Sequence, residues 1–309
     1  MSDVSGQGMD SAIAAGPAAA VSITIIIPTL CEAARRDALL RAIASIQAAG
    51  AAPVRILVVV NGQRFDAGLL AALRARGDID VLQIAEGSAT RAQLAGRKAV
   101  ATAFFSFLDD DDEYLPGALD LRLDLLRAHP QADVAVTNGY LTHGGSDELL
   151  YSRLDKVGAD PLAELFQQNW LASCNNLMRS ASVTVAHFEA ALPYMEWTWL
   201  AFRLALEGKR PVVSNVPTFR YHNTPGSLSK SASYLSSRVA LYEHMLALAP
   251  PAAIRTTLKR RLCSAWHEIS VAEQQDGRRR AALHAHLMSM SRHWSGLKFL
   301  PFSRHLLFA

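Results

Sequence analysis

Hydrophobic residues in the first third of the chain form short, continuous runs separated by segments in which they recur at helical spacing. The runs are rich in Val, Ile and Phe, which is typical of strands buried on both faces of a parallel sheet. These predicted strands cover residues 21–27, 55–60, 80–85 and 104–108, and Pro28 is expected to end the first. The segments between them predict helices over residues 36–49, 67–76 and 89–101. Strands that alternate with helices require parallel crossovers, so we expect a Rossmann-like three-layer α/β/α sandwich.

The alternation of strands and helices weakens beyond residue 140. A helix is expected over residues 117–129 and a strand over 133–137, after which Gly144 and Gly145 indicate a loop. From residue 231 the pattern becomes helical, with helices predicted over 234–248, 251–275 and 278–291. We therefore divide the chain into a flexible N-terminal tail (1–20), an α/β domain (21–230) and a helical, basic C-terminal region (231–309).

Composition places the chain among folded, globular proteins. Half of its 309 residues are hydrophobic and 19% are charged, which excludes a disordered chain. The three cysteines, Cys31, Cys174 and Cys263, form no C-x-x-C pair, so we expect neither a disulfide framework nor a cysteine zinc site, as is usual in the cytoplasm. Asp3 and Asp10 stand where an export signal carries positive charge, and no apolar stretch is long enough to predict a membrane-spanning helix.

Five consecutive acidic residues, Asp109 to Glu113, directly follow the fourth predicted strand. Ligands of open α/β sheets bind at the carboxyl ends of the strands, which is where this run is expected to lie. Neighbouring carboxylates repel each other, so a divalent cation that is shared with a diphosphate is the simplest compensating partner. The alternative is a solvated acidic loop at the N-terminus of the next helix.

Four segments of the sequence carry a resemblance to a known family. They are Ile-Ile-Ile-Pro-Thr-Leu-Cys-Glu (25–32), Val-Val-Val-Asn-Gly (58–62), Phe-Leu-Asp-Asp-Asp-Asp-Glu-Tyr-Leu-Pro (107–116) and Tyr-Met-Glu-Trp-Thr-Trp-Leu (194–200). Together they resemble the family 2 glycosyltransferases, which have the GT-A fold, over about residues 21–230. The resemblance implies a nucleotide-binding half (21–115), an acceptor half (116–230) and inverting transfer of a sugar from a nucleotide-diphosphate sugar.

The same resemblance implies which residues bind the donor and a metal ion. Asp109 and Asp111 match the two acids of the family's D-x-D motif, and Asp112 matches a frequent third acid. Asp111, Asp112 and His222 would hold Mn²⁺ or Mg²⁺. The residues expected to contact the donor are Pro28, Thr29, Glu32, Asn61, Arg91, Arg97, Asp109 and Asp110. Residues 224–230 resemble the mobile loop that closes over the donor in this family.

Two of these assignments carry their own alternatives. Asn61 stands where the family usually has an aspartate, which leaves the preference for uridine open, although an amide oxygen still accepts a hydrogen bond from a base. Arg91 and Arg97 either reach the phosphates or only solvate their helix.

Glu196 matches the position of the family's catalytic base. A carboxylate there would take the proton of the acceptor hydroxyl, and burial beside tryptophans would raise its pKa. The alternative is that Glu196 only begins a helix that runs to residue 207. Contacts with the acceptor are expected from Trp170, Asn175, Asn176 and Trp197, although a tryptophan is also an ordinary core residue.

Positive charge is concentrated at the C-terminal end. Residues 252–309 hold ten Lys and Arg against three Asp and Glu, whereas the net charge of the whole chain is only +3. Together with the aromatic and aliphatic residues of segment 293–308, this charge indicates contact with an anionic membrane surface. A solvated basic face on a helical domain, or a self-association surface, is the alternative. We expect the protein in the cytoplasm, peripheral to the inner face of the plasma membrane, with no nucleic acid as partner.

These observations favour a metal-dependent glycosyltransferase of the hexosyltransferase type, which acts on a saccharide or a lipid-linked acceptor in surface glycan biosynthesis. One alternative is a nucleotidyltransferase that forms sugar nucleotides, but its Gly-rich pyrophosphate loop is absent after Ile27. A second is a non-catalytic domain of the same fold that binds a saccharide or a partner. Asn61 and Met195, which replace acids of the family pattern, support that second alternative. The oligomeric state is left open.

Overall fold

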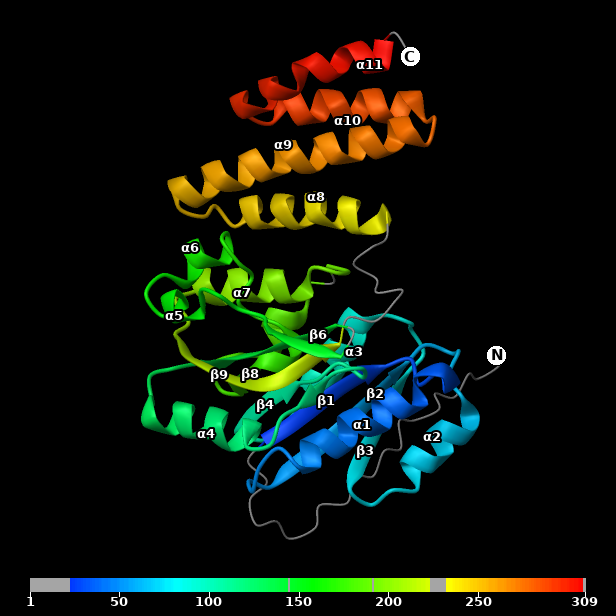
Figure 1. The fold of residues 1–309 in the computed structure, drawn as a ribbon, viewed down its shortest axis with the longest axis vertical. Helices are drawn as coiled ribbons and strands as arrows, with labels where there is room; N and C mark the ends of the chain where they lie inside the picture. The colour runs from blue at the N-terminus through cyan, green and yellow to red at the C-terminus, as the bar shows by residue number, and fades with distance from the viewer. Residues whose placement is uncertain (1–22, 144, 191, 223–231, 308–309) are drawn as a thin grey trace, which may run out of the picture.

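In the computed structural model, residues 23–143, 145–190, 192–222 and 232–307 are described, and they form an α/β body from which a stack of helices extends (Figure 1). The predicted tail (1–20) and the predicted donor loop (224–230) lie outside the described residues. The proposed domain boundaries at residues 20 and 230 therefore stay predictions.

A mixed β-sheet forms the centre of the body. Its strands follow the order β3, β2, β1, β4, β8, β6, β9, β5, and β7 pairs with β6. The parallel half contains β1 (Ile23–Thr29), β2 (Val54–Asn61), β3 (Ile79–Ile84) and β4 (Phe104–Phe107). The other half contains β5 (Glu113–Tyr114), β6 (Val134–His143), β7 (Ser146–Leu149), β8 (Asn176–Arg179) and β9 (Pro211–His222). The four strands predicted for the first third of the chain are confirmed to within two residues.

Helices on both faces of the parallel half confirm the three-layer sandwich. They are α1 (Arg36–Gln47), α2 (Ala67–Arg74) and α3 (Ala89–Lys98), with α4 (Ala118–Ala128) against the mixed half. Right-handed crossovers place α1 and α2 on one face and α3 on the other (Figure 1). Gly96 allows α3 to approach the sheet closely, because a Cβ at this position would lie 2.4 Å from Ile26 and 3.2 Å from Val59.

The prediction that Pro28 ends the first strand is wrong, because β1 continues to Thr29 and Pro28 pairs with Val59 of β2. The reason lies on the other side of β1. The backbone carbonyl of Ile26 points toward β4, where it accepts the N–H of Leu108. Alternate residues of a strand direct their backbone groups to the same side, so the backbone nitrogen of Pro28 also points away from β2. β4 has ended by this level, and no strand there needs the N–H that proline lacks.

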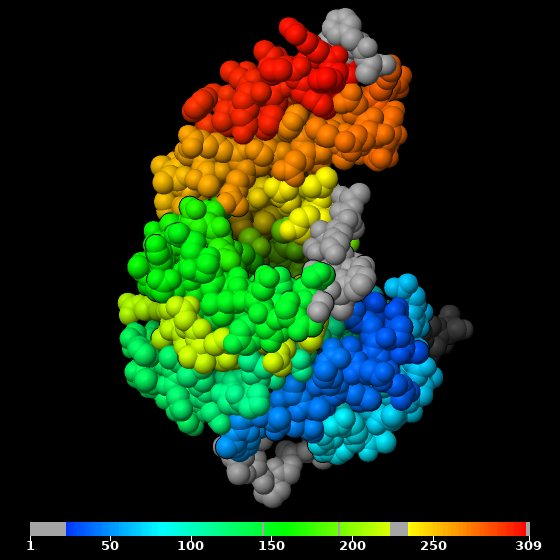
Figure 2. Space-filling model, viewed as in Figure 1, coloured from blue at the N-terminus to red at the C-terminus, as the bar shows by residue number. Residues whose placement is uncertain are grey.

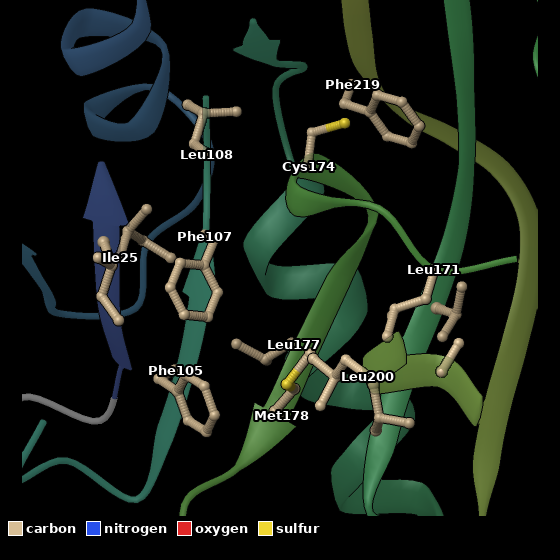
Figure 3. Close-up of a cluster of buried hydrophobic side chains, with 14 of the residues drawn as sticks. Ile25, Phe105, Phe107, Leu108, Leu171, Cys174, Leu177, Met178, Leu200 and Phe219 are labelled. Atoms are coloured by element: carbon tan, nitrogen blue, oxygen red, sulfur yellow. The ribbon is translucent and has the colours of Figure 1, made fainter. Parts of the chain in front are cut away.

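The core beside the site is built from β1, β4 and β8. Figure 3 shows Phe105 and Phe107 of β4 between Ile25 of β1 and the side chains of Leu177 and Met178 of β8. All five residues are fully buried. This packing fixes the end of β4, and therefore the position of the acidic run that follows it.

The remaining elements build the second half of the body and the C-terminal stack. The body contains η1 (Ala33–Arg35), α5 (Leu154–Val157), α6 (Pro161–Leu165), η2 (Ser173–Asn175), η3 (Val185–Phe188) and α7 (Glu196–Leu206). The stack contains α8 (Ala232–Ala247), α9 (Ala252–Gln275), α10 (Arg279–Ser291), η5 (Trp294–Phe302) and α11 (Ser303–Leu307).

The C-terminal helices lie one on another, starting with α8 on α7 and ending with η5 and α11 on α10 (Figure 1). The three long helices predicted beyond residue 231 are confirmed to within two residues. On the face drawn in Figure 2, the surface is hollowed between the stack and the α/β body. None of the helices in the described ranges is both long enough and apolar enough to cross a lipid bilayer.

Candidate active site

The acidic run forms a tight turn at the carboxyl end of β4. The N–H of Leu108 still bonds to β1, and the chain then reverses so that the Asp112 N–H donates to the Asp109 carbonyl at 3.2 Å. Beyond the turn the chain enters β5, which pairs with β9. Asp110 is 6% exposed and Asp112 only 1%. A solvated acidic loop, the alternative considered from the sequence, does not fit these two side chains.

Asp110 is held by residues of β1 and of the turn that follows it. Thr29 Oγ1 donates to Asp110 Oδ2 at 2.5 Å. The guanidinium of Arg35 forms ion pairs with Asp110 and, at 3.0 Å, with Asp111 Oδ2. Burial raises the pKa of the Asp110 carboxyl, while Arg35 and Thr29 oppose the increase because they stabilise its charged form. Sequence reasoning missed Arg35, since no spacing signal separates it from the neighbouring Arg36.

Asp112 and His222 meet where β9 ends. The His222 N–H donates to Asp112 Oδ1 at 3.0 Å, whereas the ring Nε2 of His222 lies 3.0 Å from Glu113 Oε1. The other carboxylate oxygen of Asp112, Oδ2, is buried and has no hydrogen-bond partner among the described residues. Burial and the negative charges of Asp109 and Asp111 raise the pKa of Asp112 well above its usual range.

Asp109 connects the acidic turn to two other elements of the site. Ser173 Oγ, in η2, donates to Asp109 Oδ2 at 2.8 Å. Burial raises the pKa of Asp109 to about 7, Ser173 opposes this increase, and the nearby charges of Asp111 and Glu196 add to it. The structure thus brings Glu196 into the same electrostatic cluster as the acidic turn, although it lies 84 positions after Asp112 in the sequence.

Glu196 is the first residue of α7, as the helix alternative predicted, and it also lines a pocket. The pocket is narrow and partly open to solvent, with a cavity volume of about 10 Å³, and its lining includes Thr90 and Gln93 of α3 together with Trp197. Burial raises the pKa of Glu196, and the neighbouring Gln93 side chain opposes the increase. Glu196 Oε2 is buried and lacks a hydrogen-bond partner within the described part of the chain. A carboxylate in this condition is suited to accept a proton from a bound hydroxyl.

The acidic turn offers oxygen atoms of the kind that Mg²⁺ and Mn²⁺ prefer. Over residues 23–143, 145–190, 192–222 and 232–307, no three His, Cys, Asp or Glu side chains are grouped as a complete ligand set. A cation held by one or two carboxylates, with phosphate oxygens and water completing its shell, needs no such group. The unpartnered Oδ2 of Asp112 and the like charges around it fit a site of this kind. The role of His222, whose ring contacts Glu113, stays a prediction.

The predicted donor residues of β1 and β2 lie together at the same edge of the sheet as the acidic turn. Asn61 Nδ2 donates to the Thr29 carbonyl at 2.9 Å, which ties the end of β2 to the end of β1. Asn61 is buried, and Thr29 also contacts Asp110. Glu32 is partly exposed and lies 3.7 Å from Arg64, as measured from its Oε1 to the arginine Nε. Of the four predicted donor residues here, Thr29 contacts the acidic turn directly and Asn61 is bound to Thr29, while contacts of Pro28 and Glu32 with the donor stay predictions.

The two arginines of α3 differ in what they contact. The Arg97 guanidinium is buried against the ring of Phe105 and donates to the carbonyls of Ser180 and Val183 at 2.8 and 2.9 Å. These contacts give Arg97 a structural role, and we leave it out of the proposed donor site. Arg91 is exposed, and its Nε lies 3.4 Å from Glu86 Oε2.

The predicted acceptor residues have their polar atoms engaged within the protein. Trp170 is 2% exposed and its Nε1 donates to the Pro161 carbonyl at 2.9 Å. Asn175 donates from Nδ2 to the Trp170 carbonyl, and Asn176 donates to the Ala172 carbonyl. These three side chains shape the loop that carries Ser173. Trp197 differs from them, because it lines the pocket beside Glu196 and is only partly buried.

Comparison with known families identifies one match. A model of the family described as Glycosyl transferase family 2 matches residues 24–178, half of the chain. The match covers β1, the acidic turn and η2, and it ends before Glu196. No curated protein matches the chain in sequence.

Solved structures show where the same fold occurs. S. aureus TarS 1-349 in complex with UDP-GlcNAc is 13% identical with a TM-score of 0.63, covering 87% of this chain and 81% of that one. The same fragment in complex with UDP is 13% identical with a TM-score of 0.61, covering 92% and 90%. The structure of S. aureus TarS is 12% identical with a TM-score of 0.60, covering 90% and 55%. The fold is therefore of the GT-A type.

Proposed function

Because the chain belongs to glycosyl transferase family 2, we propose that it is a metal-dependent, inverting glycosyltransferase. It transfers a sugar, of the hexose type, from a nucleotide-diphosphate sugar to a saccharide or lipid-linked acceptor in surface glycan biosynthesis. The observation that carries the proposal is that Glu196, which lines a pocket, lies close enough to Asp109 for their charges to interact, beside the buried Asp110 and Asp112 of the acidic turn. Inverting transfer requires a base for the acceptor hydroxyl on one side and a charge-neutralised diphosphate on the other.

The residues divide into three groups with different tasks. Asp111 and Asp112 would hold the Mn²⁺ or Mg²⁺ ion, which neutralises the departing diphosphate when bound. Asp109 and Asp110, fixed by their hydrogen bonds to Ser173 and Thr29, contact the donor. Glu196 takes the acceptor proton on its unpartnered Oε2.

UDP-GlcNAc is the first donor to test. S. aureus TarS, which shares the fold, was crystallised with UDP-GlcNAc and with UDP. Asn61 in this chain has its amide nitrogen bound to the Thr29 carbonyl, and its side-chain oxygen is the group that would meet the base. Donors with other bases, GDP-, dTDP- and CMP-sugars, belong in the same screen.

Calorimetric titration of the purified protein with these donors, in Mn²⁺ or in EDTA, tests the donor and metal roles together. We expect a UDP-sugar to bind in Mn²⁺ and to bind at least tenfold more weakly in EDTA. Asp111→Ala should remove the effect of Mn²⁺, whereas Asp37→Ala, at an exposed position of α1, should not. Unchanged binding by Asp111→Ala would reject Asp111 as a metal ligand.

The same screen separates the proposal from the non-catalytic alternative. A domain that only recognises a saccharide or a partner binds none of the donors, in Mn²⁺ or in EDTA, and hydrolyses none of them. A nucleotidyltransferase would instead form a nucleotide sugar from a sugar phosphate and a nucleoside triphosphate, a reaction that can be assayed through released pyrophosphate.

A lipid-linked acceptor would place the enzyme at the inner face of the plasma membrane. The basic C-terminal region is then the part of the chain expected to meet the lipid. Saccharide and lipid-linked acceptors are distinguished by testing transfer to a soluble oligosaccharide and to the same saccharide on a lipid carrier.

A further inference from the structure

The 3₁₀ helix η5 has three different sides. A 3₁₀ helix has three residues per turn, so residues three apart stand above one another in a single stripe. The inner stripe consists of His293, Gly296, Phe299 and Phe302, and it packs on the helical stack. The ring of Phe299 stacks on His267 of α9 with 4.0 Å between centroids. A Cβ at Gly296 would lie 2.0 Å from the Ser289 carbonyl of α10, so the helix can approach α10 only with glycine here.

The second stripe is apolar and exposed to solvent. It consists of Trp294, Leu297 and Leu300, whose exposed fractions are 70%, 61% and 56%. Exposed apolar side chains that occur singly need no explanation, but three in one line along a helix form a continuous ridge. Figure 1 places η5 and α11 at the end of the stack that is farthest from the sheet.

The third stripe lies beside the ridge and is basic. Lys298 and Pro301 of η5 are three residues apart, Arg304 follows in α11, and all three are exposed. Arg260 of α9 adds a further positive charge, with its guanidinium 5.8 Å from the centre of the Trp294 ring. In the described structure, neither Lys298 nor Arg304 forms an ion pair with an acidic side chain.

The acidic side chains of this region form ion pairs with other arginines. Glu268 forms an ion pair with Arg238, and both Glu273 and Asp276 pair with Arg278. These are the three acidic residues of segment 252–309, which holds ten Lys and Arg. The outer end of the stack therefore combines an apolar ridge with uncompensated positive charge.

We propose that this ridge and its basic flank form a docking surface for a lipid bilayer that contains anionic lipids. Trp294, Leu297 and Leu300 enter the boundary between headgroups and acyl chains, to a depth of about 5–10 Å. Lys298, Arg304 and Arg260 remain at the level of the phosphates, where each cation is attracted by the negative surface potential. A tryptophan at this level has its preferred position, since its ring is apolar and its N–H meets water.

The same features disfavour other binding partners for this surface. A second copy of the chain would bring two basic surfaces together, and their charges repel. A nucleic acid would pair with the arginines but would leave the tryptophan and the leucines without an apolar partner. The docking surface lies at the far end of the stack from the acidic turn, so its test requires no donor, acceptor or enzymatic activity.

Sedimentation of the full-length protein with vesicles measures the interaction directly. We expect binding to phosphatidylcholine vesicles with about 30 mol% phosphatidylglycerol, and at least tenfold weaker binding to vesicles of phosphatidylcholine alone. Raising the salt from 0.1 to 0.5 M NaCl should weaken the binding, because the Debye length falls below its value of about 10 Å at 0.1 M. The tryptophan emission should shift to the blue on binding, and Trp294→Phe should abolish this shift.

Two sets of variants separate the apolar and the electrostatic contributions. Trp294→Ser with Leu297→Ser removes the ridge, and Lys298→Glu with Arg304→Glu reverses the basic flank. Each pair should weaken binding at least tenfold. The matched controls are Leu149→Ser with Val216→Ser, which are 54% and 53% exposed on the α/β body, and Arg127→Glu on α4. The controls should bind as the original protein does, and thermal unfolding should show all variants to be folded.

Three results would overturn the proposal. The first is that the full-length protein binds neither type of vesicle. The second is that both variant pairs bind the anionic vesicles as well as the controls do. The third is a dimer seen by sedimentation velocity without vesicles and abolished by Leu297→Ser, which would assign the ridge to a second copy of the chain.

Discussion

Ser173 donates a hydrogen bond to Asp109, with 2.8 Å between the hydroxyl oxygen and Asp109 Oδ2. The two residues are 64 positions apart, and the contact joins the acidic turn after β4 to η2, which precedes β8. The bond stabilises the ionised carboxylate and so opposes the increase in pKa that burial imposes on Asp109. The loop around η2 therefore controls both the position and the charge of an acid in the proposed donor site.

Removing this hydroxyl by Ser173→Ala should lower kcat/KM for the donor by about tenfold or more. A hydrogen bond to a charged group contributes roughly 1.5–3 kcal/mol, and each 1.4 kcal/mol corresponds to about a factor of ten. Steady-state kinetics with varied donor measures the change. Ser146→Ala, whose hydroxyl lies on exposed β7, is the matched control. If the two variants had equal kcat/KM, the hydrogen bond from Ser173 to Asp109 would have no effect on the reaction.

Glu196→Gln should leave donor affinity nearly unchanged while it lowers the rate of transfer by about 10²–10⁴-fold. The amide has nearly the same shape as the carboxylate, but it cannot take the acceptor proton. Donor affinity by calorimetry and single-turnover transfer separate the two effects. Near-normal transfer by this variant would remove Glu196 from the role of base.

The pH dependence of transfer should show an acidic limb to which Glu196 contributes, together with Asp109 and Asp112, whose pKa values are also raised. A base must be deprotonated to act, and burial raises the pKa of Glu196 above the ordinary value of about 4.3. We therefore expect kcat/KM to fall as the pH decreases through this raised pKa, at a pH where an exposed glutamate would still be ionised. A profile that stays flat down to pH 4.5 would contradict the assignment.

The parallel half of the fold was predictable because its strands are continuous apolar runs. Residues 23–27 and 56–61 are buried one after another, and such short continuous apolar runs are typical of strands covered on both faces. The strands β5, β7, β8 and β9 escaped prediction. Two or four residues carry no periodicity, which explains the first three, and β9 has only two fully buried residues among its twelve. β5 follows the acidic turn and pairs with β9, and β8 follows the loop around η2 and pairs with β4 and β6.

The candidate site was predictable where chemistry is concentrated in the sequence, and not where it depends on a distant contact. The five acids in a row and Glu196 beside tryptophans were visible as residue types. Arg35 and Ser173 were not, since each gains its role only when folding places it against an acid more than 60 residues away. The reverse holds for Arg97 and Trp170, whose residue types suggest binding although their polar groups are used by the core.

The carboxylate of Glu196 should also cost the protein stability at neutral pH. Its pKa is raised in the folded state, so the folded protein binds the proton more tightly than the unfolded chain does. The stability that this group contributes is therefore lost as the pH rises from the pKa of Glu196 in the unfolded chain through its raised pKa in the folded protein. We expect Glu196→Gln to increase Tm at pH 7.5 by roughly 2 °C, and the difference to disappear near pH 4. A lower Tm for the variant at pH 7.5 would contradict this expectation.

Arg122 of α4 is fully buried, without an acidic partner among the residues described, and it supports the loop that contains Ser173. Its guanidinium lies over the ring of Tyr114, and it donates to the Cys174 carbonyl at 2.6 Å and to Thr218 Oγ1 at 2.7 Å. Burial lowers the pKa of this arginine. The backbone and hydroxyl oxygens around it would lose their partners if the side chain were removed.

Arg122→Met should therefore lower the free energy of unfolding by about 3 kcal/mol or more, since each buried acceptor left unpaired costs roughly 1–3 kcal/mol. Urea unfolding followed by circular dichroism measures the change. Arg127→Met provides the control on the same helix, because Arg127 is exposed and pairs only weakly, at 3.5 Å, with Asp124; it should change stability by less than about 0.5 kcal/mol. If Arg122→Met were as stable as Arg127→Met, the buried guanidinium would not be what holds η2 against α4, and the position of Ser173 would have to depend on the asparagines of its own loop.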